Sequence, residues 1–591
     1  MDYADLPLLP VPRILRMTGA PFARPAALAL DVEDASLRTN AEISAALAGK
    51  ICGLPVNPQA PWRVKVLRDA TLVGEAYGLS VTEQGAVVSA GAPEGVSRAF
   101  ASLAQILLAG PRAVAIADAP AFSRRGYMLD ISRDRVPARR TLGHLLDLLW
   151  LCKVNELQLY VEHTFAFAGH EEVWKNASPL RPADILWLRD QCAARGIELV
   201  PNLNSLGHFG RWLEHPSYRR LSECPEGCVM PSGRVFPPGG TTLFPSPETL
   251  EFLADLYDQY LPLFSSRRFN GGLDEPWELG MGRSREICEK LGKHRVYLDH
   301  LSAVAKLAAR HGKSLEFWAD IVLEKPETVP QLPEGITGMI WGYEKGHPFE
   351  SHCAAFEKAG VPFVACPGTT GWNSLGGRWE NASTNIAEAV RAARVHGGRG
   401  LLLTDWGDNG HHQPLPVTLP PLLFFASRAW NPDAEPDVAA GIDLVLGDSS
   451  KKAGKLLLAL GSAAERHFSL RLHNTSPAWK LFFTPAKDLP GILPPEDAAN
   501  LAAFRAEMAQ IAASGKDLRP ERLGGKLVAE EIALAARMMD FGAFRAQKAL
   551  GQSAASTDTI AILADDFAEL WLKRSERGGL AESLARITAV D

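Results

Sequence analysis

Two adjacent carboxylic acids, Asp274 and Glu275, form the grouping in this sequence that is best suited to acid–base chemistry. They follow the apolar segment RFNGGL, and two neighbouring negative charges repel each other, so their adjacency indicates a functional reason. Tryptophans and further carboxylic acids recur through the same part of the chain. Indole rings stack on the apolar faces of sugar rings, and carboxylates hydrogen-bond sugar hydroxyls. The combination predicts a carbohydrate site that carries out acid–base chemistry.

Short apolar runs alternate eight times with helical segments from residue 122 onward. The expected strands are 124–132, 155–162, 198–204, 268–275, 314–321, 337–343, 362–368 and 400–407. Strands that alternate with helices imply parallel pairing through right-handed crossovers, and eight such units close a barrel. We therefore expect an α/β protein with a catalytic (β/α)8 TIM barrel over residues 121–430.

Two further domains flank the expected barrel. Residues 1–120 predict a small α/β domain, with a hairpin that turns at 83–85 and a helix that ends at Gly110-Pro111. Residues 431–591 carry helical, Ala/Leu/Arg-rich stretches without a strand signal, which predicts an α-helical C-terminal domain. Within the barrel, the long loop 207–246 is rich in Pro and Gly, and loops of this length are usually functional or disordered.

Composition argues against some classes of partner and indicates the compartment in which the protein is expected. A net charge of −6 over 591 residues gives no footprint for nucleic acid, and no apolar run is long enough to span a membrane. The N-terminal segment lacks the pattern of a secretory signal, and the eight scattered cysteines favour a reducing compartment, so we expect a cytoplasmic protein. Only Cys224 and Cys228 are close in sequence, which leaves a loop disulfide open, and we expect neither a metal nor a cofactor.

Active sites of this barrel fold lie at the C-terminal ends of the strands. The first expected strand has Arg125 near its start and Asp130 and Arg133 at its end, where these two could simply pair with each other. The candidate substrate-binding residues on the eight strands are Arg125, Glu162, His208, Trp318, Trp341, Tyr343, Trp372, Trp406 and Asp408. Any one of the tryptophans could instead fill the barrel core, and His208 could be a loop histidine without a catalytic role.

The adjacency of the acidic pair also constrains the mechanism. Neighbouring residues of a strand point to opposite faces, so Asp274 and Glu275 cannot easily flank one glycosidic bond as acid and nucleophile. If one carboxyl group protonates the leaving oxygen, the other must act elsewhere on the same sugar. This arrangement suits a substrate that carries its own nucleophile, a 2-acetamido group.

The segment FNGGLDE resembles the strand-four signature of glycoside hydrolase family 20, the β-hexosaminidases, which ends in Gly-X-Asp-Glu. The resemblance implies that Glu275 is the general acid/base and that Asp274 contacts the acetamido nitrogen. The segment RRGYMLDISRDR is similar to the first strand of the family, which implies that Arg125 binds the C3 and C4 hydroxyls.

Other positions extend the resemblance over roughly residues 60–430. It implies that His208 is the histidine of strand three and that Asp408 contacts the C4 and C6 hydroxyls. The tryptophans that would wall the sugar pocket are Trp318, Trp341 and Trp406. The sequence departs from the family at strand two, where His163 replaces the expected acid and leaves that role to Glu162. It also departs after strand seven, where Trp372 and Asn373 stand in place of a tyrosine. Tyr343 is a candidate to replace that tyrosine.

The resemblance implies an exo-β-N-acetylhexosaminidase that releases terminal β-linked GlcNAc or GalNAc with retention, by substrate assistance. We expect a carbohydrate substrate, no nucleic-acid or membrane partner, and a homodimer as one oligomeric state open to it. A glycosidase for another amino sugar, such as glucosamine or a sulfated GlcNAc, is a second hypothesis. A carbohydrate-binding homologue without catalysis is a third, against which the intact acidic pair argues.

Overall fold

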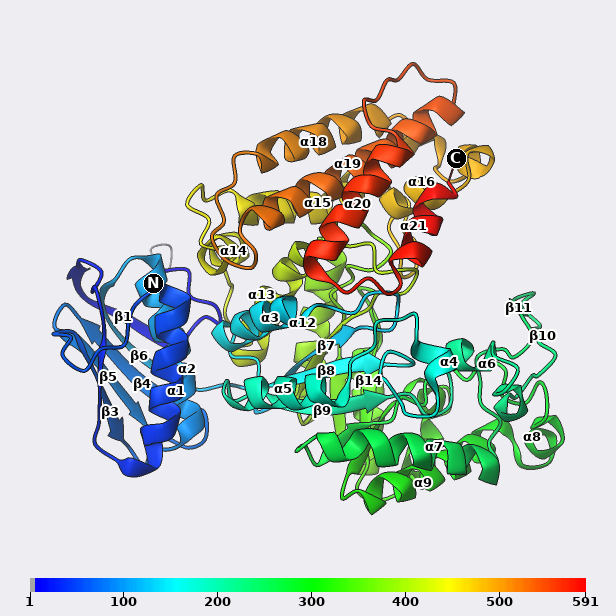
Figure 1. The fold of residues 1–591 in the computed structure, drawn as a ribbon, viewed down its shortest axis with the longest axis horizontal. Coiled ribbons are helices and arrows are strands. Elements are labelled where there is room, and N and C mark those ends of the chain that lie inside the picture. The colour runs from blue at the N-terminus through cyan, green and yellow to red at the C-terminus, as the bar shows by residue number, and fades with distance from the viewer. Residues whose placement is uncertain (1–5, 591) are drawn as a thin grey trace.

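The computed structural model describes residues 6–590 and places them in three parts along the chain (Figure 1). A sheet domain comes first, drawn in blue, and is followed by a barrel in cyan and green. A group of helices, drawn from yellow to red, packs on one side of the barrel. Residues 1–5 and 591, at the outer ends of the two expected flanking domains, lie outside the described residues.

The first part is a six-stranded sheet in the order β1-β6-β4-β5-β3-β2. Its elements are β1 (Ile14–Pro21), β2 (Ala29–Val32), α1 (Ala35–Cys52), β3 (Arg63–Arg68), β4 (Tyr77–Thr82), β5 (Gly85–Ala90), α2 (Pro93–Ala109) and β6 (Arg112–Asp118). Strands β4 and β5 form the predicted hairpin, with Thr82 paired to Gly85. Helix α2 ends at Gly110, as its stop signal predicted, and its apolar residues from Val96 to Leu107 are fully buried.

Eight parallel strands close the central barrel, which confirms the predicted (β/α)8 fold. The strands are β7 (Arg125–Asp130), β8 (Glu156–Val161), β9 (Glu198–Leu203), β12 (Arg268–Asn270), β13 (Ser314–Trp318), β14 (Thr337–Trp341), β15 (Phe363–Cys366) and β16 (Leu401–Asp405). The longer helices around them are α3 (Arg139–Leu151), α5 (Pro182–Ala193), α7 (Pro247–Tyr260), α9 (Lys293–Arg310), α11 (Phe349–Ala359), α12 (Trp379–Val395) and α13 (Leu419–Trp430). The shorter ones are α4 (Glu171–Trp174), α6 (Gly210–Leu213), α8 (Arg285–Leu291) and α10 (Asp320–Leu323).

Buried ion pairs fill the N-terminal end of the barrel. Arg124 binds Glu156 at 2.5 and 2.8 Å and Glu316 at 2.7 and 2.8 Å, and Arg268 reaches Glu156 from strand β12. Both glutamates are at most 1% exposed. Charges buried this deeply are stable only when they are paired. The network fills the floor of the barrel interior.

The loop 207–246 carries α6 and a small hairpin of β10 (Cys228–Val229) and β11 (Val235–Phe236). Arg234, beside this hairpin, lies 5.4 Å from the ring of Trp277, which is 38% exposed and follows Glu275 by two residues. Cys224 and Cys228 are free thiols in this structure. The hairpin projects from the edge of the barrel (Figure 1), but through Arg234 the loop contacts a residue two positions from Glu275.

Residues 431–590 form helices and loops, as the sequence predicted. The helices are α14 (Val438–Leu446), α15 (Ala453–His467), α16 (Pro477–Phe483), α17 (Pro495–Ala498), α18 (Leu501–Gly515), α19 (Lys526–Ala549), α20 (Ile560–Arg574) and α21 (Leu580–Thr588). Buried polar contacts join them to the barrel, because the hydroxyl of Ser583 donates to Asp134 and to the carbonyl oxygen of Gly410. Over residues 6–590, no helix combines the length and the apolar character that crossing a membrane requires.

Candidate active site

A pocket of about 460 Å³, counted out to its open mouth, lies at the C-terminal ends of the barrel strands. Its lining residues are Arg133, His208, Asp274, Glu275, Trp318, Trp341, Tyr343, Trp372, Trp406, Asp408 and Asn474. The pocket brings together nine of the eleven residues that the sequence analysis selected. The two that do not line it are Glu162 and Arg125.

The acidic pair follows a short strand and a sharp turn. The expected strand 268–275 ends at Asn270, which corrects the expectation that Asp274 and Glu275 point to opposite faces of a strand. The reason is local, because Gly272, Leu273 and Glu275 all adopt positive φ angles of 67°, 72° and 46°. Such angles are strained for residues other than glycine and are frequent at functional sites. The turn lets both carboxyl groups face the same pocket.

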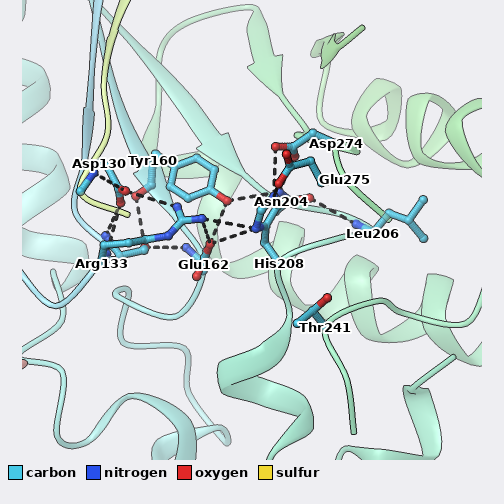
Figure 2. A network of polar contacts seen from close by, with 12 residues as sticks. Asp130, Arg133, Tyr160, Glu162, Asn204, Leu206, His208, Thr241, Asp274 and Glu275 are labelled. Atoms are coloured by element: carbon cyan, nitrogen blue, oxygen red, sulfur yellow. Dashed lines mark hydrogen bonds and ion pairs between the residues drawn. The ribbon is translucent and has the colours of Figure 1, made fainter. Parts of the chain in front are cut away.

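His208 joins the two carboxyl groups (Figure 2). Its Nε2 lies 3.1 Å from Asp274 Oδ2 and 3.6 Å from Glu275 Oε2, so both acids lie on one side of the pocket. Asn204 donates a second hydrogen bond of 2.8 Å to Asp274 Oδ1. Burial alone would raise the pKa of Asp274, but His208 and Asn204 outweigh it and lower that pKa below its ordinary value. Asp274 is therefore held as a carboxylate.

Glu275 has the opposite electrostatic setting. Burial raises its pKa, and the neighbouring charge of Asp274 raises it further, against the opposing effect of His208. Its backbone N–H donates to Asp320 Oδ2 at 3.1 Å, which anchors the turn to strand β13 and its following helix. Two carboxyl groups whose environments push their pKa values apart can serve as acid and as anion at the same pH.

Behind His208, a chain of charges reaches back to the first two barrel strands (Figure 2). Arg133 binds Asp130 at 3.3 Å, Glu162 at 3.1 Å and His208 Nδ1 at 3.3 Å. Burial lowers the pKa of His208, but Asp274 raises it more strongly, to about 9. Whether His208 is neutral or charged, its Nε2–H donates to Asp274. In the neutral ring Nδ1 accepts a hydrogen bond from Arg133. In the charged ring Nδ1 carries a proton and faces Glu162 at 3.7 Å. Glu162 thus holds Arg133 and His208 from behind the pocket.

Arg125 does not reach the pocket, which corrects the expectation that it binds substrate. It starts strand β7, at the floor end of the barrel, where it is 1% exposed. There it binds Glu75 of the first domain at 2.7 and 2.8 Å and the carbonyl oxygen of Lys153 at 2.8 Å. Arg133, which comes after the strand has ended, lines the pocket instead. The rule that sites lie at strand C-termini favours Arg133 over Arg125 on the sequence alone.

Aromatic side chains form much of the pocket wall. Trp341 stacks on Tyr343 at 5.1 Å, and Trp372 meets the edge of Tyr343 at 5.0 Å. The indole N–H of Trp406 donates to the Tyr343 hydroxyl at 2.8 Å, which leaves the phenol proton to donate elsewhere. The buried indole nitrogens of Trp318 and Trp341 have no partner in the structure, so they too are donors for a bound molecule. The wall offers ring faces together with hydrogen-bond donors, as a sugar requires.

Asp408 and Asn474 complete the lining, and the sequence analysis missed Asn474. Burial raises the pKa of Asp408 to about 6, although Arg133 opposes this. Asp408 accepts a hydrogen bond of 3.3 Å from Asn373 in the loop after β15. Asn474 belongs to the helical domain, between α15 and α16, where no barrel motif could have pointed to it.

The described residues support neither a second functional cavity nor a metal site. A larger cavity of about 1,410 Å³ lies among α18, α19 and α20, but its Arg537 and Asp566 already pair with each other at 2.5 Å. Over residues 6–590, no group of three or more His, Cys, Asp or Glu side chains is placed to hold a metal ion.

Comparison with known proteins agrees with this geometry. The model of the glycosyl hydrolase family 20 catalytic domain matches residues 122–394, and that of domain 2 of the same family matches residues 5–119. Hexosaminidase D of Bos taurus is 26% identical over 341 residues, which are 52% of this chain and 93% of that protein. A beta-hexosaminidase of Akkermansia muciniphila is 27% identical over 284 residues, 42% of this chain and 56% of that protein.

Solved structures share the fold at low identity. The chitobiase of Flavobacterium johnsoniae superposes with a TM-score of 0.61 at 17% identity and covers 100% of both chains. The exo beta-N-acetylglucosaminidase of Vibrio harveyi, in complex with N-acetylglucosamine, gives a TM-score of 0.59 at 17% identity over 77% of each chain.

Proposed function

Because this chain belongs to glycoside hydrolase family 20 and is a β-N-acetylhexosaminidase-like hydrolase of carbohydrate, we propose that it releases terminal β-linked GlcNAc or GalNAc with retention. The nucleophile in this proposal is the acetamido group of the substrate. The observation that carries it is the placement of Asp274 and Glu275 within 3.6 Å of one His208 nitrogen. Two acids on one side of a pocket do not face each other across a glycosidic bond, as acid and nucleophile of a double displacement must.

The two acids then have different tasks. Glu275, whose pKa is raised, gives its proton to the glycosidic oxygen as the bond from C1 to that oxygen breaks. Asp274, held ionised, accepts the acetamide N–H and stabilises the positive charge that develops as the acetamide oxygen bonds to C1. Water then attacks C1 of the oxazolinium-like intermediate and passes a proton back to Glu275, while the bond between C1 and the acetamide oxygen breaks and the acetamide group is restored. Two displacements at C1 leave its configuration unchanged.

The other lining residues bind and orient the sugar in this proposal. The faces of Trp318, Trp341 and Trp406 pack against the ring and the acetamide group. The phenol proton of Tyr343 donates to the acetamide oxygen. Tyr343 thereby replaces the family tyrosine that is absent after strand seven. Arg133 and Asp408 bind hydroxyls, with Arg133 taking the place that the sequence analysis gave to Arg125. The closed floor and small volume favour a single terminal sugar over an internal stretch of a chain.

A comparison of aryl glycosides tests the proposal. The protein should hydrolyse aryl β-GlcNAc or β-GalNAc but not aryl β-glucosaminide, because without the acetyl group the substrate has no nucleophile. A thiazoline analogue of the bound intermediate should inhibit competitively. Turnover of the free amine would assign the attack to a protein carboxylate and favour the amino-sugar hypothesis. Thiazoline binding without turnover of any glycoside, sulfated ones included, would favour the binding protein.

A further inference from the structure

The helical domain sends one turn, residues 472–475, to the mouth of the barrel. Leu472 and Thr475 pair across this turn, and Asn474 at its tip has a φ of 51°. This left-handed conformation is tolerated by Asn better than by most residues. The turn thus presents Asn474, and Asn474 lines the same pocket as the acidic pair.

Barrel loops hold the backbone of this turn on both sides. The N–H of Asn474 donates to Glu344 Oε1 at 2.8 Å, and Arg378 in turn fixes Glu344 through two contacts of 2.9 and 3.0 Å. The carbonyl oxygen of Asn474 accepts from Asn373 Nδ2 at 3.1 Å. A side chain whose backbone is fixed in this way is held in place before any ligand arrives.

The side-chain amide of Asn474, in contrast, is left unsatisfied. Its Oδ1 is buried and has no hydrogen-bond partner in the structure. A buried acceptor without a partner is costly, and in a ligand pocket its partner is commonly the ligand. The same Asn373 Nδ2 that donates to the backbone carbonyl of Asn474 also donates to Asp408, so Asn474 and Asp408 are neighbours in the pocket lining.

We propose that Asn474 is a specificity-determining residue, whose amide oxygen accepts a hydrogen bond from the C4 or C6 hydroxyl of the terminal sugar. This inference rests on the proposed function, in which Asp408 binds hydroxyls of the terminal sugar. The resemblance to the family implies that these are the C4 and C6 hydroxyls. It makes the helical domain part of the substrate site rather than a separate module.

Deoxy substrates test the proposal. Rates would be measured on aryl β-GlcNAc and on its 4-deoxy and 6-deoxy analogues, with wild type and with Asn474→Gly, which removes the side chain but readily adopts the positive φ. We expect Asn474→Gly to lower kcat/KM on aryl β-GlcNAc by about tenfold, the usual effect of one hydrogen bond. On one of the two deoxy analogues the variant should lose little relative to wild type, because the bond is already absent. That analogue identifies the hydroxyl.

Controls separate this role from a structural one. His473→Ala alters the exposed neighbour on the same turn and should leave the rates and the Tm unchanged. Asn474→Asp keeps an acceptor and a residue that tolerates positive φ, so it should recover part of the loss. Equal losses on all three substrates, or no loss on any, would overturn the role of Asn474 and leave the proposed function intact. A wild type inactive on every N-acetyl glycoside would instead overturn both.

Discussion

Asp274 accepts a hydrogen bond from His208, with 3.1 Å between Oδ2 and Nε2, and the same nitrogen lies 3.6 Å from Glu275. His208 itself has a φ of 61°, and Gly207 before it approaches the backbone of Asp274 so closely that a Cβ there would lie 2.2 Å from the carbonyl oxygen. The loops after strands β9 and β12 are therefore fitted to each other. The contact fixes the relative position of the two acids. His208 lowers the pKa of both, but burial and the charge of Asp274 still leave the pKa of Glu275 above its ordinary value.

Glu275→Gln should abolish the acid role while leaving the sugar bound. We expect kcat/KM to fall by about 10²–10⁴-fold for aryl glycosides with poor leaving groups. The loss should be much smaller for a dinitrophenyl glycoside, whose leaving oxygen needs no proton. Rates across a series of phenols measure this, and an equal loss across the series would remove Glu275 from the acid role.

Asp274→Asn should lower kcat by about 10²–10³-fold, because a neutral amide cannot stabilise the charge that develops on the acetamide. Asp408→Asn, on the hydroxyl side of the pocket, is the matched carboxylate control and should act mainly on KM. Steady-state rates on aryl β-GlcNAc separate the two. A rise in KM alone for Asp274→Asn would contradict its assigned task.

The pH profile of kcat/KM should depend on His208. Activity needs Asp274 ionised and Glu275 protonated, so it falls below the pKa of Asp274 and above that of Glu275. His208 lowers both of these pKa values. In His208→Gln, which carries no charge, both pKa values rise, and both limbs of the profile should move to higher pH. His396→Gln, which removes a histidine paired with Glu350 and Glu357 outside the pocket, should move neither limb.

Tyr343→Phe should reduce kcat by about 10²-fold if the phenol proton donates to the attacking acetamide oxygen. The change also leaves the Trp406 indole N–H without its acceptor, so the Tm should be measured alongside. The inhibition constant of a thiazoline, which carries sulfur in place of that oxygen, provides a second measurement. Unchanged kcat with a lowered Tm would make Tyr343 structural only.

Arg125 and Arg133 should differ in what their loss affects. Arg125→Gln leaves Glu75, which is 11% exposed, with Arg98 as its remaining ion-pair partner, and loss of a buried ion-pair partner costs about 3–5 kcal/mol. We expect a lower Tm with kcat/KM unchanged at temperatures where the variant is folded. Arg133→Gln should lower kcat/KM under the same conditions. If the folded Arg125→Gln variant lost activity, Arg125 would belong to the substrate site after all.

Local patterns in the sequence determined the architecture and pointed to the acidic pair. Apolar runs that alternate with helical segments predict eight barrel strands because hydrophobic periodicity is a property of neighbouring residues. The acidic pair after RFNGGL and the recurring tryptophans indicated a sugar site at the ends of these strands. All of these signals lie within a few residues of the side chain that they identify.

Only the tertiary structure decided which side chains meet. The positive φ angles after Asn270 turn both acids into one pocket, and no strand pattern encodes that turn. Arg125 pairs with Glu75 of the first domain, a contact that no local pattern encodes. Asn474 reaches Asp408 through Asn373 from a domain that follows the barrel in sequence. Such contacts depend on packing between distant segments, which the order of residues along one segment does not specify.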